Sequence, residues 1–125
     1  MLTIYKTKAF ERYYLKERID DSTLNEAIKE VLHSTKGGLG HKLYKARIGS
    51  PFKGKRGSYR AIVYYKLGSR LIFLHLYAKN EKATISHSEM KGFMLLSKDL
   101  DRLTDQDIRQ LLALNELVRY TYEEK

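Results

Sequence analysis

Two apolar runs separated by a short turn constrain the fold of this chain more than any other feature. The runs are AIVYY at residues 61–65 and LIFLHLYA at residues 71–78, and Gly68-Ser69 lies between them. A glycine turn between runs rich in β-branched and aromatic residues is typical of a β-hairpin. Both runs are apolar on both faces in their middles. We therefore expect this hairpin at the centre of a sheet, with polar side chains at the strand ends.

Alternation along the strands predicts which side chains share a face. The first hairpin strand groups Arg60, Ile62, Tyr64 and Lys66, and the second groups Leu71, Phe73, His75, Tyr77 and Lys79. The preceding run, LYKARIG at residues 43–49, alternates an apolar face of Tyr44, Ala46 and Ile48 with Leu43, Lys45 and Arg47. LTIYK at residues 2–6 is predicted to be a short opening strand.

Helical spacing and capping signals predict four helices. The first spans about residues 8–18. The second carries an apolar stripe over residues 24–32, with Thr23 and Glu26 as a capping box and Gly37-Gly38 ending it. Ser86 with Glu89 begins a third, and Thr104 with Asp107 begins a fourth that carries residues 108–117 and ends in the charged tail.

This order of elements predicts an α+β fold: a small twisted antiparallel sheet with helices packed on one face. The other face would stay open and carry Lys45, Arg47 and Arg60. With 125 residues and one proline, the chain is expected to form a single domain over residues 1–125. Its helical C-terminal region would extend from about residue 100.

The positive charge of the chain is concentrated in one segment. The net charge is +9, and residues 31–80 hold eleven Lys or Arg and no Asp or Glu. The remainder carries thirteen Lys or Arg against fifteen acids. A basic cluster gains affinity for a polyanion by releasing condensed counterions, so nucleic acid is the expected partner. A merely solvated basic face is the alternative.

Several kinds of site are not expected. The chain has no cysteine, which excludes disulfides, thiol nucleophiles and cysteine-bound metals. Its histidines lack metal-ligand spacing, and no phosphate-binding glycine loop is present, so we expect neither a metal nor another cofactor. The apolar runs are shorter than the roughly 20 residues of a membrane helix, and no signal-peptide core opens the chain. A cytoplasmic protein is the expectation.

Lysine, arginine and tyrosine around an open sheet form a set that can cleave RNA without metal. The 2′-hydroxyl would attack the adjacent phosphate, and an arginine on a rigid strand would stabilise the charge that develops on the phosphoryl oxygens. A lysine beside a like charge could transfer protons, and an aromatic ring could stack the nucleotide. From composition alone, RNA binding without cleavage is equally open.

A resemblance to a known family favours cleavage. KGKRGSYRAIVYY at residues 53–65, followed by RLIFLHLYAKNEKATIS at residues 70–86, resembles the RelE/HigB-type toxins of bacterial toxin–antitoxin systems, within the RelE/ParE superfamily. The resemblance covers about residues 39–90. It implies a compact sheet with helices on one side and metal-independent mRNA cleavage, usually on the translating ribosome. It also implies inhibition of translation.

The resemblance assigns roles to particular residues. It implies that Arg60 contacts the scissile phosphate, and that Lys45 and Arg47 form the basic pair where a proton-transfer lysine is often found. The polar end of the last hairpin strand would be Lys79 and Asn80. The basic loop that approaches RNA would hold Lys53, Lys55 and Arg56.

Some positions depart from the family pattern. Certain relatives have an arginine where Asn80 stands, and others a functional tyrosine shortly after the strand. The nearby candidates here are Tyr77, Ser86 and His87, of which His87 is either a proton donor or an ordinary surface residue. The region beyond Asp99 is longer than in many relatives. A homodimer contact, an antitoxin contact and additional core are all open for it.

The resemblance also implies partners: mRNA, the ribosome and a cognate antitoxin. The antitoxin would shield the basic face with an acidic or helical segment and carry a helix-turn-helix module for DNA. Two alternatives stay open. One is inhibition of DNA gyrase, as ParE-type toxins do, and the other is a non-enzymatic RNA- or ribosome-binding module.

Overall fold

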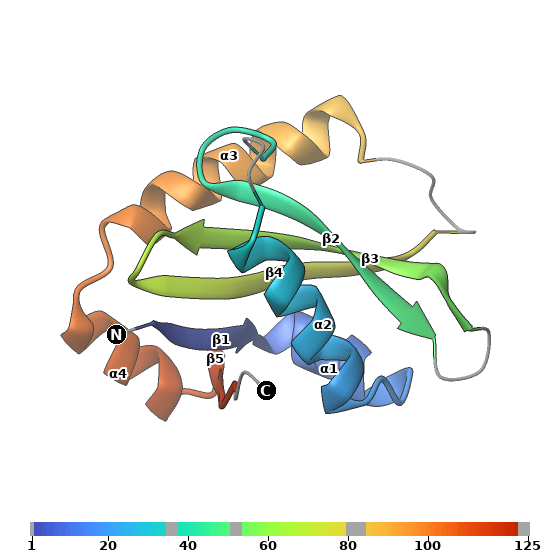
Figure 1. Cartoon of the computed structure of the whole chain (residues 1–125). Helices are drawn as coiled ribbons and strands as arrows, with labels where there is room; N and C mark the ends of the chain where they lie inside the picture. The colour runs from blue at the N-terminus through green and yellow to red at the C-terminus, as the bar shows by residue number, and fades with distance from the viewer. Residues whose placement is uncertain (1, 35–37, 51–53, 80–84, 123–125) are drawn as a thin grey trace.

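Five strands and four helices make up the described part of the chain (Figure 1). The structure is a computed structural model that describes residues 2–34, 38–50, 54–79 and 85–122, without the side chains of residues 50 and 54–58. The strands are β1 (Thr3–Thr7), β2 (Leu43–Ser50), β3 (Gly54–Lys66), β4 (Arg70–Ala78) and β5 (Leu117–Tyr120). The helices are α1 (Lys8–Lys16), α2 (Asp21–Leu32), α3 (His87–Asp101) and α4 (Asp105–Ala113).

The strands form one mixed sheet in the order β2-β3-β4-β1-β5. The predicted β3–β4 hairpin is confirmed, with Lys66 opposite Arg70 and Gly68 at a φ of 73° in its turn. The α+β class is also confirmed, but the wholly antiparallel sheet is wrong, because β1 runs parallel to β4. Parallel neighbours need a long crossover, and α1, α2, β2 and β3 provide one here.

Helices cover both faces of the sheet, so the prediction of helices on one face is wrong. On one face, α1 and α2 pack against Ala61, Val63 and Phe73. On the other, side chains of α3 and α4 pack against Ile62 and Tyr64. The physical reason is the two-faced apolar character of the hairpin, because each face must be removed from water.

A β-bulge in β4 changes the face on which its later side chains lie. Val63 is opposite Phe73, but Ile62 is opposite His75, so Leu74 is an extra residue. Phe73 therefore packs with α1, whereas His75 contacts the ring of Phe93 on α3. The predicted grouping of residues 71, 73, 75, 77 and 79 on one face is wrong, because a bulge shifts the alternation by one residue.

The C-terminal region adds to the core and is not wholly helical. Helix α4 ends at Ala113, Asn115 turns the chain with a φ of 59°, and β5 pairs with β1 antiparallel. Leu117 and Tyr120 are buried on opposite faces of the sheet. The predicted helix through residue 117 is wrong because pairing with β1 satisfies the backbone of this segment as a strand.

The helix starts were predicted with mixed success. Both capping boxes, Ser86 with Glu89 and Thr104 with Asp107, are confirmed. The box of Thr23 with Glu26 is wrong, because α2 begins earlier and Asp20 accepts the main-chain N–H of Thr23 at 2.9 Å. Hydrogen bonding by the side chain of Thr23, followed by this main-chain hydrogen bond, lowers the pKa of Asp20 below its ordinary value.

A buried charge joins β1 to the elements around it. Lys6 is 6% exposed, and its Nζ lies 2.8 Å from Oε1 of Glu11 on α1. The same ammonium lies 4.5 Å from the ring centroid of Tyr14 and 5.3 Å from that of Tyr120. The aromatic hydroxyls bind α2, since Tyr14 donates to Asp21 and Tyr120 to Asn25. This Lys6 cage holds α1, α2 and β5 around β1.

Two clamps hold α3 and α4 to the sheet. The Tyr64 hydroxyl donates to Oδ1 of Asp101 at 2.5 Å, and Lys42 Nζ lies 3.1 Å from Oδ2. These contacts, led by the Tyr64 hydrogen bond, hold the pKa of Asp101 below its ordinary value. Arg70 donates to the main chain of Leu103 at 2.8 Å and to Asp105 at 2.9 Å.

Replacing Lys6 by alanine is expected to lower the free energy of unfolding by about 3 kcal/mol, because Glu11 would be left without its partner in a largely buried site. Urea unfolding followed by circular dichroism measures the change. Lys8→Ala, at an exposed position two residues away, is the control and should change the value by less than about 0.5 kcal/mol. Equal effects of the two substitutions would contradict the role given to the cage.

The stability of the fold should depend on Tyr120 at alkaline pH. Burial, followed by the nearby Asp21, raises the pKa of Tyr120 from 10.0 to about 12. The stabilisation is complete below the unfolded pKa of 10.0 and is lost as the pH rises to about 12. The stability difference between the wild type and Tyr120→Phe should therefore shrink over this interval. A difference that stays constant in pH-dependent urea unfolding would refute the assignment.

Candidate nucleic-acid interface

The sheet brings together two of the arginines predicted to act on RNA. Arg47 on β2 is directly opposite Arg60 on β3, and Arg60 is directly opposite Tyr77 on β4. In the next row, Lys45 is opposite Ile62, which is opposite His75. Residues directly opposite each other share a face. Both rows therefore lie on the face that packs against α3, at the margin toward the free edge of β2.

Like charges placed directly opposite on neighbouring strands destabilise a sheet. Arg47 and Arg60 hold such positions, with Cα atoms about 4.5–5.5 Å apart by the geometry of an antiparallel pair. A local arrangement that costs stability is typical of a functional site. An anion bound between the two guanidinium groups would offset the repulsion.

The three cations of these rows differ in how firmly they are held. Arg60 is half-buried, and its Nη1 donates to the main-chain carbonyl of Tyr59 at 3.3 Å. Lys45 and Arg47 are exposed, and neither side chain forms an ion pair with the described residues. Arg60 therefore offers a positioned guanidinium, and the other two offer charge that can adapt to a ligand.

Tyr77 is a core residue in this structure. It is 5% exposed, and its ring stacks on His75 with centroids 5.7 Å apart. The imidazole of His75 in turn contacts Phe93 on α3 at 5.5 Å. Sequence reasoning did not single out His75, because the bulge that turns it toward this face leaves no mark in the alternation of side chains.

Of the remaining predicted site residues, some lie apart from these two rows of side chains and others lie outside the described residues. Lys79 is exposed one residue beyond β4, and His87 is the exposed first residue of α3. Lys53 and Asn80 lie outside the described residues. Lys55 and Arg56 lie within β3, whose pairing with β2 extends to Gly54, so their predicted place in a loop is wrong.

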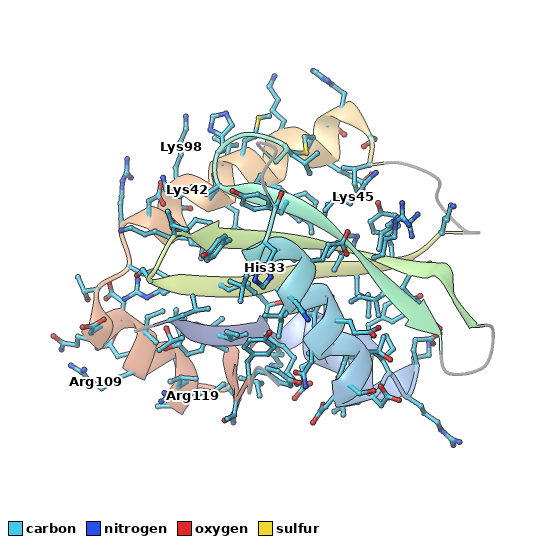
Figure 2. The ribbon with its side chains drawn as sticks, viewed as in Figure 1. His33, Lys42, Lys45, Lys98, Arg109 and Arg119 are labelled. Carbon is cyan, nitrogen blue, oxygen red and sulfur yellow. The ribbon has the colours of Figure 1, made fainter. Side chains whose placement is uncertain are left out.

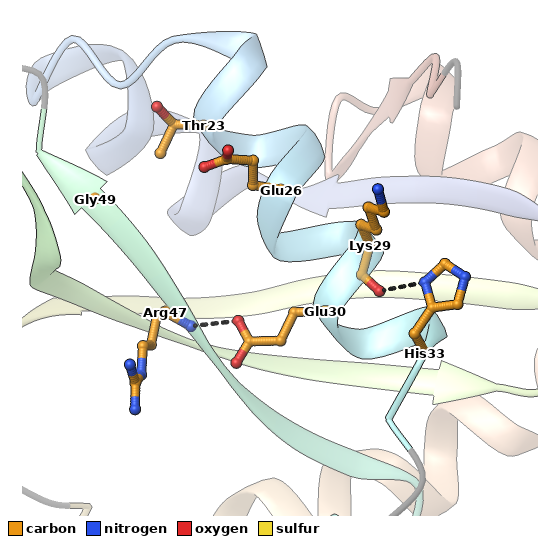
Figure 3. Close-up of a pocket in the computed structure, with 7 residues that line it drawn as sticks. All are labelled: Thr23, Glu26, Lys29, Glu30, His33, Arg47 and Gly49. Atoms are coloured by element: carbon orange, nitrogen blue, oxygen red, sulfur yellow. Dashed lines mark hydrogen bonds between the residues drawn. The ribbon is translucent and has the colours of Figure 1, made fainter. Parts of the chain in front are cut away.

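A hollow of about 630 Å³ between α2 and β2 is poorly suited to an anion (Figure 3). It is lined by Thr23, Glu26, Lys29, Glu30, His33, Arg47 and Gly49. Glu30 accepts the main-chain N–H of Arg47 at 3.4 Å, and the guanidinium of Arg47 points away from that carboxylate (Figure 3). The two glutamates would repel a phosphate inside this hollow. An anion is therefore expected to meet the guanidinium of Arg47 outside it, on the other side of the strand (Figure 3).

Cations are also present away from these rows. Lys42, Lys45 and Lys98 lie near β2 and α3 in the upper part of the view, whereas Arg109 on α4 and Arg119 on β5 lie in its lower part (Figure 2). Lys42 is engaged by Asp101. Arg109 and Arg119 thus provide matched controls for tests of the strand cations.

Two further findings concern metal binding and membrane-spanning helices. The described residues contain no group of three or more His, Cys, Asp or Glu side chains placed to hold a metal ion. Among the helices described, none is long and apolar enough to cross a membrane.

The fold and the paired arginines define an α+β protein with a cationic face at the margin of its sheet. A family model described as "RelE toxin of RelE / RelB toxin-antitoxin system" matches residues 2–119. The chain therefore belongs to the RelE toxin family, and is a toxin of a toxin–antitoxin system. The match includes α4 and most of β5. Among curated proteins, none matches the sequence of the chain.

Removing both exposed strand cations should weaken the salt dependence of binding to single-stranded RNA. Each phosphate contact contributes about 0.7 to the slope of log K against log salt. Lys45→Ala combined with Arg47→Ala should thus reduce the slope by about 1.4, as measured by fluorescence anisotropy. Arg109→Ala combined with Arg119→Ala should leave it unchanged. Equal losses in both double variants would mean that binding is spread over the whole surface.

Proposed function

We propose that this toxin is a ribosome-dependent endonuclease that cleaves mRNA and thereby inhibits translation. The directly opposed Arg47 and Arg60 carry the proposal, because they concentrate positive charge where one phosphate could contact both. The family match supports it. Membership of the RelE family also supports pairing with an antitoxin.

In the proposed reaction, the 2′-oxygen of a ribose forms a bond to the adjacent phosphorus, and the bond from phosphorus to the 5′-oxygen breaks. The products are a 2′,3′-cyclic phosphate and a free 5′-hydroxyl. A base removes the proton of the 2′-hydroxyl, and an acid donates a proton to the leaving 5′-oxygen. DNA lacks the 2′-hydroxyl, so the reaction is specific for RNA.

Arg60 is the residue best placed to stabilise the transition state. Its side chain is half-buried and lies on an inner strand, with β2 on one side and β4 on the other. A guanidinium held on a rigid strand need not reorganise when charge develops on the phosphoryl oxygens. Its planar fork can also donate to two oxygens at once.

Lys45 and Arg47 would draw the RNA backbone onto the sheet and complete the charge around the phosphate. Lys45 lies one row from the paired arginines, so its ammonium could also take part in proton transfer. The exposed Lys79 at the end of β4 is a further proposed catalytic residue. The proposed RNA contacts are Lys53, Lys55, Arg56, Tyr77, Asn80 and the exposed His87. The exposure of Lys45 and Arg47 on an edge strand suits a large substrate such as a ribosome-bound mRNA.

The antitoxin would neutralise this cationic margin. We expect it to present carboxylates to Arg47 and Lys45, because exposed cations without ion pairs among the described residues gain most from such a partner. A helix-turn-helix module on the antitoxin would bind DNA. A purified pair should release free toxin at high salt if this contact is mainly electrostatic.

Arg60→Ala should abolish mRNA cleavage, with a loss of at least about a hundredfold for removal of one positioned charge donor. Purified chain is added to a cell-free translation extract, and cuts are mapped by primer extension. Arg60→Lys should recover only part of the activity because an ammonium lacks the fork. Arg119→Ala, on β5 at the sheet edge opposite β2, should cut like the wild type.

Intact mRNA and normal translation with the wild-type chain would refute the nuclease proposal and direct attention to DNA gyrase. Cleavage by Arg60→Ala at the wild-type rate would instead refute the role of Arg60. Salt-sensitive ribosome binding without any cleavage would identify a binding module.

A further inference from the structure

A second hollow lies at the edge of β4 beyond the end of β1. Pairing of β1 with β4 stops at Lys6 and Phe73, and the chain then turns into α1. Among the described strands, none pairs with this edge of β4 after Phe73. The hollow measures about 410 Å³ and is lined by Ala9, Phe10, Tyr13, His75, Leu76, Tyr77 and Glu89.

The lining of this hollow combines aromatic walls with a few polar groups. Phe10 and Tyr77 are buried and form fixed walls, whereas Tyr13, His75 and Glu89 are half-buried. Small-molecule sites in proteins are typically concave and apolar, with a few placed polar groups. Proteins that read single-stranded RNA hold unstacked bases against aromatic rings and bind the edges of those bases.

The hollow adjoins the paired arginines. Tyr77, one of its walls, is directly opposite Arg60 on the neighbouring strand. A nucleotide whose phosphate contacts Arg60 could therefore extend its base across β4 toward the hollow. Arg60 lines neither this hollow nor the one between α2 and β2, but the aromatic walls and the position of Tyr77 opposite Arg60 distinguish this hollow from the other, whose described lining holds two glutamates and no aromatic ring other than His33.

Glu89 sets which base the hollow would prefer. Its Oε1 accepts the main-chain N–H of Ser86 at 3.1 Å, so the capping box of α3 orients the carboxylate. An ionised carboxylate only accepts hydrogen bonds. Guanine presents two adjacent donors, N1–H and the 2-amino group, on its Watson–Crick edge. Adenine and cytosine present an acceptor nitrogen beside their amino group, and that nitrogen would face the carboxylate unfavourably.

We propose that the hollow between α1, β4 and the start of α3 binds a guanine base of the RNA substrate, with Glu89 accepting hydrogen bonds from its Watson–Crick edge. This rests on the proposed function. The site makes cleavage selective for a guanine at one fixed position relative to the scissile phosphate at Arg60. Glu89 is then a specificity-determining residue, and the rings of Tyr13 and His75 are the surfaces that position the base.

Glu89→Gln is the variant that tests this site. Glutamine can also serve in a capping box, so the start of α3 should be preserved. Its amide presents a donor where the carboxylate presented an acceptor. Glu26→Gln is the control, because it makes the same chemical change at an exposed carboxylate on α2.

The assay uses a cell-free translation extract and an mRNA with a randomised window of codons, and the cut ends are sequenced. The wild type and Glu26→Gln should favour guanine over adenine at one position by about tenfold, in line with one bidentate base contact. Glu89→Gln should bring this ratio near parity. A wild type without a guanine preference, or an unchanged ratio in Glu89→Gln, would overturn the proposal.

A second measurement separates this proposal from the nuclease proposal. If the wild type makes no ribosome-dependent cuts, the proposed function fails, and binding of GMP and AMP to the free chain is then measured by NMR. Shifts of the Tyr13, His75 and Glu89 signals with GMP, weaker with AMP and lost in Glu89→Gln, would support the guanine site alone. Equal shifts with both nucleotides, or none, would reject it.

Discussion

The burial of β3 and β4 on both faces is the constraint on which the rest of this structure depends. Ile62 and Val63, adjacent in the chain, point to opposite faces, and both are fully buried. Each face therefore needs its own helical layer, α1 and α2 on one side and α3 and α4 on the other. Charged side chains of β2 and β3 are then confined to the margin that these helices leave uncovered. The position of Arg47 and Arg60 follows from this confinement.

The bulge at Leu74 links the core to the candidate site. Without the extra residue, His75 and Tyr77 would lie on the α1 face, and Arg60 would have no aromatic neighbour on β4. The early end of β1 acts together with the bulge, because it leaves the edge of β4 open where these rings lie. A single inserted residue and one short strand thus place aromatic rings beside the paired arginines.

Much of the fold and part of the site could be predicted from the sequence. The hairpin and two capping boxes have local signals, and the alternation of β2 and β3 sets Arg47 and Arg60 correctly on one face. The parallel pairing of β1, the bulge and β5 could not be predicted, because they depend on contacts between distant segments. Leu117 fits a helical stripe as well as a strand, and only pairing with β1 decides between them.

The carboxylates of the chain explain why the cationic margin keeps its charge. Asp20 and Asp107 accept main-chain N–H groups at helix starts, and Asp101 accepts hydrogen bonds from Tyr64 and Lys42. These contacts lower the pKa of all three carboxyl groups, so the charges stay fixed at structural positions. Three acids that cap helices or clamp α3 are thus held away from the exposed cations of β2. Lys45 and Arg47 form no ion pair with the described residues, so an external anion is their natural counterpart.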